Sequence, residues 1–310
     1  MADYGHDLQF GFFLDPATGT PGRTLEIAHI LDDLGYDLIG IQDHPYQQKH
    51  YDTMALIGYL LGQTERIRVF PDVANLPLRP PAMLAKQAAT LDQLSGGRFE
   101  LGLGAGAFWD AIRAMGGPAR QPREALGALR EAVEIIRASW AGTTLRHDGD
   151  HYRAVGARPG PLPAHDIGLW LGVIGPRALR LAGEVADGWV PSMSYVPPAQ
   201  TARSNAIIDE AARGAGRDPA AIRRIYNIGG DVTPVIEAGG GESDDDQQIV
   251  GPRDHWVAVL TRLATVHGFS TFVLWGVPTA PRLRMFIEDI APAVRERVAE
   301  VRASRAAAAG

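Results

Sequence analysis

A regular alternation of short apolar segments with amphipathic helical segments is the feature that most restricts how this chain folds. Each apolar segment has the length of a buried strand, and each is followed by apolar residues spaced three or four positions apart. The strand segments are residues 9–14, 37–41, 66–70, 99–103, 167–173, 188–190, 224–228 and 269–275. Because every helical crossover returns the chain to the same end of the sheet, this alternation predicts parallel strands.

The helical segments carry recognisable starts and stops. Pro80 and Pro81 open one helix, and Gly96 with Gly97 closes it. The most regular helical spacing lies in residues 126–136, where apolar positions follow one another at intervals of three, four and three residues. These signals support helices, not further strands, between the apolar segments.

Eight strand–helix units in 310 residues favour a closed (β/α)₈ barrel over an open sheet, because closure removes both exposed edges. A doubly wound open sheet would usually carry a glycine-rich dinucleotide fingerprint after its first strand. Residues 15–20 of this chain hold a single glycine, Gly19. We therefore expect the α/β class, with a single (β/α)₈ TIM barrel spanning residues 1–310.

Two segments interrupt the alternation and are expected as loop insertions at the C-terminal face of the barrel. Residues 141–166 are rich in glycine, proline and histidine, and residues 235–250 contain the acidic run Asp244–Asp246. The acidic run is expected to be a solvated loop, since it lacks the spacing of a calcium-binding loop. The last helix is expected over residues 283–294, with a frayed end at residues 305–310.

The composition excludes several classes of function. Cysteine is absent, which excludes disulfides, thiolate metal sites, iron–sulfur clusters and cysteine nucleophiles. With 30 basic and 36 acidic residues the net charge is −6, so no basic face for nucleic acid is expected. The N-terminal residues lack a signal-peptide pattern, and no run approaches 18 apolar residues. We expect a cytoplasmic protein with no nucleic-acid or membrane partner.

Function in this type of barrel gathers at the C-terminal ends of its strands, so the residues that follow the strands are the candidate functional residues. Asp43 and His44 follow the second strand. A carboxylate beside an imidazole can supply a general acid or base that works near neutral pH. The same pair can equally make ordinary hydrogen bonds in a turn.

Two further strand ends carry glycine. The run Gly102-Leu103-Gly104-Ala105-Gly106 would let a flat ligand approach the backbone, or it relieves crowding inside a barrel. Gly175-Pro176-Arg177 lies where a strand turns into a helix. Free N–H groups and a guanidinium at this point could bind a phosphate, although the same residues also make an ordinary helix start.

Other catalytic motifs are missing from the sequence. The nine histidines form no H-E-x-x-H or other close ligand pair, so no metal site is expected. Neither a G-x-S-x-G nucleophile elbow nor a phosphate-binding G-x-x-x-x-G-K-[ST] loop occurs. The chemistry of a bound organic cofactor is then the natural candidate.

The block LAKQAATLDQLSGGRFELGLGAG, from Leu84 to Gly106, resembles the bacterial luciferase-like superfamily. The resemblance extends to Asp43-His44 and to GPRALRLAGEVADGW, from Gly175 to Trp189. It implies a flavin- or deazaflavin-dependent (β/α)₈ enzyme and a homodimer. The Asp-His pair after the second strand resembles the branch that uses the deazaflavin coenzyme F420.

The resemblance also implies roles for individual residues. Asp43 would contact the deazaflavin, and His44 would face the substrate as the proton donor or acceptor. A non-proline cis peptide at Asp72–Val73 would form a bulge beneath the ring. The residues expected to flank the cofactor are Ala105, Gly106 and Asp110, and those expected to hold its phosphate are Ile174, Gly175 and Arg177.

The expected substrate class rests on one position where this chain differs from the family's sugar-phosphate dehydrogenases and on a set of aromatic residues. Sugar-phosphate dehydrogenases of the family carry a glutamate where this chain has Ala107, which disfavours that mechanism. The aromatic residues that suggest a small apolar or aromatic substrate are Phe108, Trp109, Trp189 and Trp275. An FMN-dependent monooxygenase and a non-enzymatic flavin-binding protein are the alternatives to an F420-dependent oxidoreductase.

Overall fold

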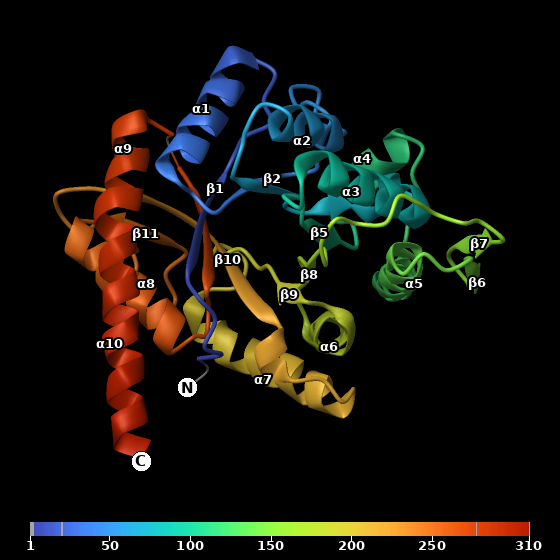
Figure 1. The fold of residues 1–310 in the computed structure, drawn as a ribbon. Helices are drawn as coiled ribbons and strands as arrows, with labels where there is room; N and C mark the ends of the chain where they lie inside the picture. The colour runs from blue at the N-terminus through green and yellow to red at the C-terminus, as the bar shows by residue number, and fades with distance from the viewer. Residues whose placement is uncertain (1–2, 20, 277, 310) are drawn as a thin grey trace. The chain divides into compact units, whose positions relative to one another are not determined.

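The computed structural model, which describes residues 3–19, 21–276 and 278–309, divides into two units (Figure 1). The first unit comprises Met1–Phe13, Glu26–Ile39 and Ile174–Gly310. The second comprises Leu14–Leu25 and Gly40–Val173. Each unit combines parallel strands with helices, so the predicted alternation is present in both.

In the first unit a parallel ladder joins strands that are far apart in the sequence. Hydrogen bonds connect β1 to β12, β12 to β10, and β10 to both β9 and β11. The strands are β1 (Gln9–Phe13), β9 (Gly188–Trp189), β10 (Arg223–Val232), β11 (Gln248–Gly251) and β12 (Thr271–Trp275). In the register of this ladder Phe10 lies opposite Phe272, and their rings stack with centroids 5.9 Å apart.

The helices of the first unit follow these strands in sequence. Figure 1 shows α7, drawn in yellow and orange, along the end of the β10 ribbon. The helices are α6 (Pro176–Val185), α7 (Pro198–Gly214), α8 (Arg253–Thr265), α9 (Ala280–Met285), α10 (Ala291–Ala309) and most of α1 (Pro21–Leu34). Among the described residues, no helix has both the length and the apolar character that crossing a membrane requires.

The C-terminal helix is longer than the sequence pattern predicted. A π-helical turn, Phe286–Ile290, links α9 to α10, and α10 continues to Ala309. The expected frayed end at residues 305–310 is therefore wrong for residues 305–309, and residue 310 lies outside the described part. Alanine is the strongest helix former, and the end of α10 is alanine-rich. Arg305 also donates to the Thr265 carbonyl at 2.7 Å, which ties α10 to α8.

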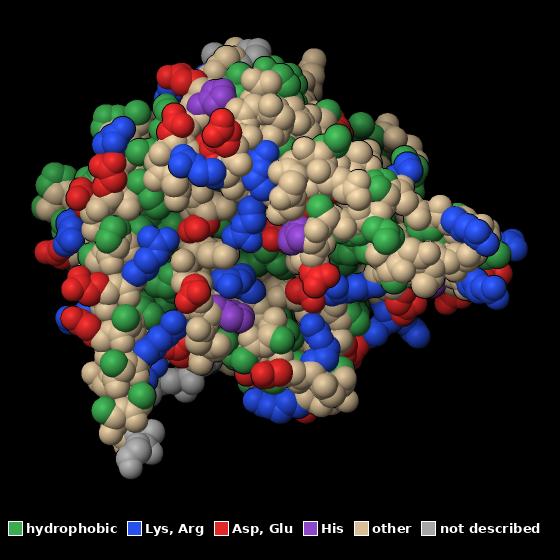
Figure 2. Space-filling view, viewed as in Figure 1, with side chains coloured by type: hydrophobic (Ala, Val, Ile, Leu, Met, Phe, Trp, Pro, Cys, Tyr) green, Lys and Arg blue, Asp and Glu red, His purple; other side chains and the backbone are tan. Residues whose placement is uncertain are grey.

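The surface of α10 is charged on its exposed side. Figure 2 shows both red and blue side chains in the region of this helix, at the left. Arg297 and Glu300 form one such pair at 3.4 Å, one turn apart. Exposed pairs of this kind contribute little to stability, so α10 depends mainly on its buried side.

The second unit contains the remaining strands and a short hairpin. β2 (Leu38–Ile41), whose first two residues belong to the first unit, pairs with β3 (Arg68–Pro71). β5 (Leu101–Gly104) pairs in parallel with β4 (Ala74–Asn75) and with β8 (Leu169–Leu171). The helices are α2 (Thr53–Leu61), α3 (Pro81–Ser95), α4 (Trp109–Ala114) and α5 (Pro122–Trp140). The eight predicted strands are all present, with ends shifted by a few residues.

The segment 141–166, expected as a loop, contains an antiparallel hairpin of β6 (Arg146–Asp148) and β7 (Arg153–Val155). Glu131 of α5 holds it. The Glu131 carboxylate accepts hydrogen bonds from the Tyr152 backbone at 2.9 Å and interacts with the His147 ring at 3.1 Å. The Glu131 side chain therefore accepts hydrogen bonds from the backbone N–H groups in the turn of the hairpin. The sequence of the segment, rich in glycine and histidine, did not predict this hairpin.

Hydrogen bonds and an ion pair order the segment 235–250. Asp246 accepts from the backbone N–H groups of Gly241 and Ser243, both at 2.9 Å. Asp244 forms an ion pair with Arg262 of α8 at 3.3 Å. The acidic run therefore builds an exposed turn, as the expectation of a solvated loop implies, and it also attaches this turn to α8.

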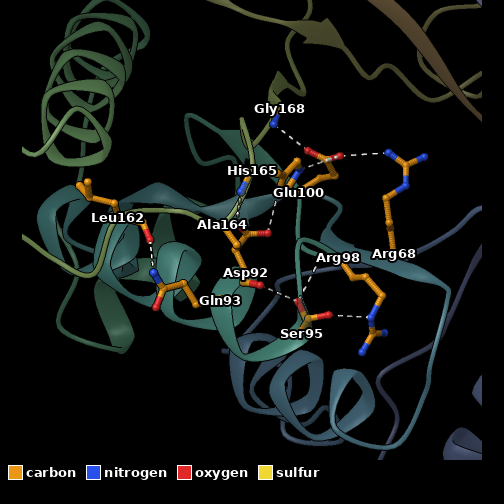
Figure 3. Close-up of polar contacts among 10 residues, drawn as sticks. All are labelled: Arg68, Asp92, Gln93, Ser95, Arg98, Glu100, Leu162, Ala164, His165 and Gly168. Carbon is orange, nitrogen blue, oxygen red and sulfur yellow. Dashed lines mark hydrogen bonds and ion pairs between the residues drawn. The ribbon is translucent and has the colours of Figure 1, made fainter.

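A network of buried polar groups joins α3, β5 and the chain leading into β8 (Figure 3). Asp92, on α3, is fully buried and accepts from the Ala164 backbone at 2.7 Å and from the His165 ring at 2.7 Å. Glu100 accepts from the Gly168 backbone at 2.6 Å and from Arg68 at 3.0 Å. Two residues of the Leu84–Gly106 block thus serve the fold by satisfying backbone groups of a distant segment.

His165 lies between the two carboxylates of this network. Its Nδ1 is 2.7 Å from Asp92, and its Nε2 is 3.6 Å from Glu100. The interaction with Glu100, together with the charge of Asp92, raises the pKa of His165 above its ordinary value, although burial opposes the shift. Protonated His165 is therefore favoured by the folded state.

This geometry predicts a stability contribution that depends on pH. Because the folded pKa of His165 is raised, the contribution is fully present below the unfolded pKa of about 6.5 and is lost as pH rises through the folded pKa. We expect the loss in unfolding free energy caused by His165→Gln to be larger at about pH 6 than at about pH 8.5. Urea titrations at both pH values measure it, with His29→Gln, at an exposed position of α1, as the control. A loss that is constant or grows with pH would contradict the assignment.

Candidate active site

Asp43 and His44 follow β2, as expected, but the Asp43 carboxylate already has protein partners. It is fully buried and accepts from Arg79 Nε at 2.6 Å and Arg79 Nη2 at 2.7 Å. The backbone N–H of Asn75 donates to it at 2.8 Å. A buried carboxylate bonded in this way fixes the chain at the end of β2. The contact of Asp43 with the deazaflavin stays a prediction.

The His44 ring is half-buried in an aromatic cluster. It stacks on Tyr46 with centroids 5.4 Å apart and an interplanar angle of 19°, and it meets Phe108 edge to face, also at 5.4 Å. Phe108 is 54% exposed, so one side of the cluster faces solvent. The cluster joins the chain after β2 to the chain after β5.

The surroundings of His44 favour its neutral form. Burial lowers the pKa of His44 below its ordinary value of 6.5, the Asp43 charge opposes this shift, and His50 adds to it. Tyr46 stays protonated, because burial and the Asp43 charge raise its pKa to about 12. A neutral imidazole with an open side is able to accept a proton from a bound molecule.

The Asp72–Val73 peptide is cis, as the resemblance implied. Asp72 is buried, and its backbone N–H donates to the Ile41 carbonyl at 2.7 Å, which attaches this turn to β2. The Val73 side chain points at glycines. A Cβ added to Gly104 would lie 2.7 Å from Val73 Cγ2, and one added to Gly172 would lie 2.9 Å from both Val73 methyl groups.

These contacts support one of the two interpretations of the glycine run, the relief of crowding. Gly102 and Gly104 make room for Val73 and for the backbone of Pro71. Gly106 has a φ of 95°, which favours glycine, and a Cβ there would lie 2.6 Å from Pro77. The run therefore relieves crowding inside the unit, because protein atoms occupy the space that a side chain at Gly102, Gly104 or Gly106 would need.

We expect Gly104→Ala to lower the free energy of unfolding by about 1–3 kcal/mol, the usual cost of overpacking a filled site. The cost should fall when Val73→Ala supplies the missing space, and urea titrations of the single and double variants measure this coupling. Gly22→Ala is the control, since a Cβ at Gly22 meets nothing within 4 Å. Equal costs of Gly104→Ala with and without Val73→Ala would contradict the packing argument.

The other residues expected around the cofactor in the second unit lie after β5. Ala105 is half-buried, and Trp109, at the start of α4, packs near Gly106, with 3.0 Å between Trp109 Cη2 and an added Cβ. Asp110 is almost fully exposed and pairs with Arg113 at 2.6 Å. Asp110 is therefore a surface residue of α4 and lies outside the aromatic cluster.

In the first unit, Ile174, Gly175 and Arg177 surround the start of α6. Gly175 has a φ of 85° and, having no side chain, leaves the first turn of α6 without a side-chain cap. Ile174 is 59% exposed, and Arg177 is also exposed. The first N–H groups of a helix have no partner within the helix, so this terminus can accept an anion.

The two tryptophans expected near the substrate differ. Trp189 is fully buried and stacks on Phe269 at 6.0 Å, so it packs in the core, and its expected contact with substrate is wrong. Trp275, at the end of β12, is 56% exposed. A strand-end position did not distinguish them, because Trp189 belongs to a two-residue strand enclosed by neighbours.

Trp275 lines a cavity of about 700 Å³ in the first unit, where β10 and β12 end. Its lining is mixed, and its polar side chains include Asn227, Asp231, Asp245, Asp246 and Gln248. No lysine or arginine is among the described residues that line it, although Asp231 pairs with the nearby Arg282 at 2.9 Å. Except for Trp275, sequence reasoning missed this group; the Gly229–Gly230 pair after a strand was the available signal.

Comparison with known proteins places these features in a family. A family model described as luciferase-like monooxygenase matches residues 4–229. The chain is 30% identical to an F420-dependent glucose-6-phosphate dehydrogenase from Nocardia farcinica, over 72% of this chain and 68% of that protein. It is 32% identical to a 5,10-methylenetetrahydromethanopterin reductase from Archaeoglobus fulgidus, over 61% of this chain and 54% of that protein. The chain belongs to the luciferase-like monooxygenase family.

A solved structure shows the fold. An F420-dependent secondary alcohol dehydrogenase, in complex with an F420–acetone adduct, matches with a TM-score of 0.80 and 20% identity. The match covers 93% of this chain and 99% of that one. The predicted α/β class and the (β/α)₈ TIM-barrel topology are thereby confirmed. The roles of individual residues and the single domain over residues 1–310 stay predictions.

Proposed function

We propose that this protein is an oxidoreductase that uses the deazaflavin F420 for hydride transfer to or from a small organic substrate. The observation that carries the proposal is the half-buried, neutral His44, held at a strand end with an open aromatic side. The comparisons support it, since one relative is named for F420 and the family model matches residues 4–229, which include His44.

The start of α6 fits a cofactor phosphate. Gly175 and Arg177 offer backbone N–H groups that the helix itself leaves without partners, and the Arg177 guanidinium adds a positive charge. A Cβ at Gly175 would meet nothing within 4 Å, so there is open space above this terminus. We propose that Ile174, Gly175 and Arg177 hold the phosphate.

Bound deazaflavin supplies a carbon centre that accepts or donates a hydride. When the substrate is an alcohol, the neutral imidazole of His44 accepts the hydroxyl proton while the hydride leaves the carbon. In the reverse direction, protonated His44 returns that proton to the carbonyl oxygen. Tyr46 and Phe108 hold the ring and exclude water from one side of it.

The residues favour an uncharged substrate. Ala107 offers no carboxylic acid after β5, and Phe108 and Tyr46 present aromatic surface beside His44. We infer a small neutral alcohol or carbonyl compound, with an apolar or aromatic part, and disfavour sugar phosphates.

The family description favours one alternative, an FMN-dependent monooxygenase. Titration of the purified protein with F420 and with FMN, followed by fluorescence, separates the two. We expect F420 to bind at least about 10-fold more tightly, a difference of about 1.4 kcal/mol. Arg177→Ala should weaken F420 binding by about 1.5–3 kcal/mol, the contribution of a hydrogen bond to a charged group. Arg180→Ala, exposed on the same helix, is the matched control.

Equal affinity for the two cofactors, or FMN bound to the purified protein, would favour the monooxygenase. An unchanged dissociation constant for Arg177→Ala would place the phosphate elsewhere.

We expect His44→Ala to lower turnover by about 10²–10⁴-fold, because general acid–base catalysis contributes that much. The measurement is deazaflavin absorbance with a panel of neutral alcohols and ketones. F420 affinity should change little, and Tyr46→Phe, which keeps the ring under His44, is the control. Lost F420 binding with normal turnover at saturation would make His44 a binding residue instead.

A further inference from the structure

Arg79 ties together the two ends of the loop that carries His44. It lies between the turn Leu76–Leu78 and α3, and its side chain is only 10% exposed. Its Nε and Nη2 donate to Asp43 at 2.6 and 2.7 Å, and Nη2 also donates to Asp52 at 2.7 Å. Asp43 and Asp52 begin and end the ten-residue segment 43–52, which contains His44 and Tyr46.

The carboxylate of Asp52 has two separate tasks. Asp52 is the N-cap of α2, and its Oδ1 accepts from the Ala55 backbone at 2.9 Å, while Oδ2 accepts from Arg79. The start of α2 is thereby attached to the same guanidinium that holds Asp43. A second tie lies beside it, where the Thr53 hydroxyl donates to the Gln42 carbonyl at 2.7 Å.

We propose that Arg79 is a positioning residue that closes the 43–52 loop and thereby sets the orientation of the His44 imidazole. This inference rests on the proposed function in that the oriented imidazole is the one we assign to proton transfer. Arg79 itself touches no reacting atom; it acts through Asp43, the chain neighbour of His44.

The chemistry of the site favours arginine at this position. The guanidinium presents planar, fixed donors, so one side chain can serve two carboxylates at once, whereas a lysine is a point charge without this fork. Its contacts with Asp43 and Asp52 outweigh burial and raise the pKa of Arg79, so it stays charged. Burial alone would raise the pKa of the Asp52 carboxyl. The hydrogen bonds from the Ala55 N–H and from Arg79 outweigh burial and lower this pKa.

The test uses Arg79→Lys, which keeps the charge and removes the fork. The readout is the His44 ring in two-dimensional NMR, assigned by its loss in His44→Ala. The groups that influence its titration are Asp43, His50 and the protonated Tyr46. In Arg79→Lys we expect the His44 signal to lose the ring-current shift that Tyr46 causes. We also expect the pKa of His44 to rise toward 6.5, because the imidazole becomes less buried.

Turnover should fall about 10–100-fold, the usual effect of a small misplacement of a reacting group, with F420 affinity unchanged. Thr53→Val is the matched control, because it removes the neighbouring tie and spares Arg79; it should lower stability and leave the His44 signal unchanged. If Arg79→Lys does not fold, Asp52→Asn replaces it. Asparagine keeps the helix cap and removes one carboxylate charge, and a smaller shift of the His44 signal is expected.

A folded Arg79→Lys, or a folded Asp52→Asn in its place, with an unchanged His44 signal and titration would overturn the inference. That result is independent of turnover. Wild-type protein that binds no F420 and turns over no substrate would instead overturn the proposed function, and the NMR comparison of the variants would stand without it.

Discussion

Buried carboxylates with complete sets of partners hold the second unit in its folded form. Asp43, Asp92 and Glu100 are each at least nine-tenths buried, and each accepts from a backbone N–H as well as from a basic side chain. Removing a charge from water costs several kcal/mol, so such groups are tolerated only where hydrogen bonds and opposite charges compensate. Each carboxylate therefore fixes the chain segment whose N–H groups it accepts.

The sequence pattern predicted the strands and helices because burial along a strand and helical spacing are local properties. It predicted the ends of elements and the order of loops less well, because these depend on contacts between segments. Arg305 donates to the Thr265 carbonyl near the end of α10, and Asp246 accepts from the Gly241 N–H in the acidic segment. The cis peptide at Asp72–Val73 came from the resemblance, not from any local pattern. The homodimer and the cytoplasmic location stay predictions.

The site was predicted in part. His44 lies at a strand end, as predicted, whereas its stacking on Tyr46 and its edge-to-face contact with Phe108 were not predicted. The partner of Asp43 could not be predicted, because Arg79 is 36 residues away and nothing local to either residue indicates the pair. Trp189 and Trp275 share a strand-end position, but Trp189 is fully buried and stacks on Phe269, whereas Trp275 is 56% exposed.

Because Asp43 and Asp52 share the Arg79 guanidinium, these positions differ in how well they tolerate substitution. Losing Asp52 leaves Arg79 still paired with the buried Asp43, so the remaining charges are balanced. Replacing Arg79 with a neutral residue leaves the buried Asp43 carboxylate without its opposite charge. In a drifting or engineered lineage, position 52 can thus vary first, whereas a loss of charge at position 79 calls for a matching loss of charge at position 43.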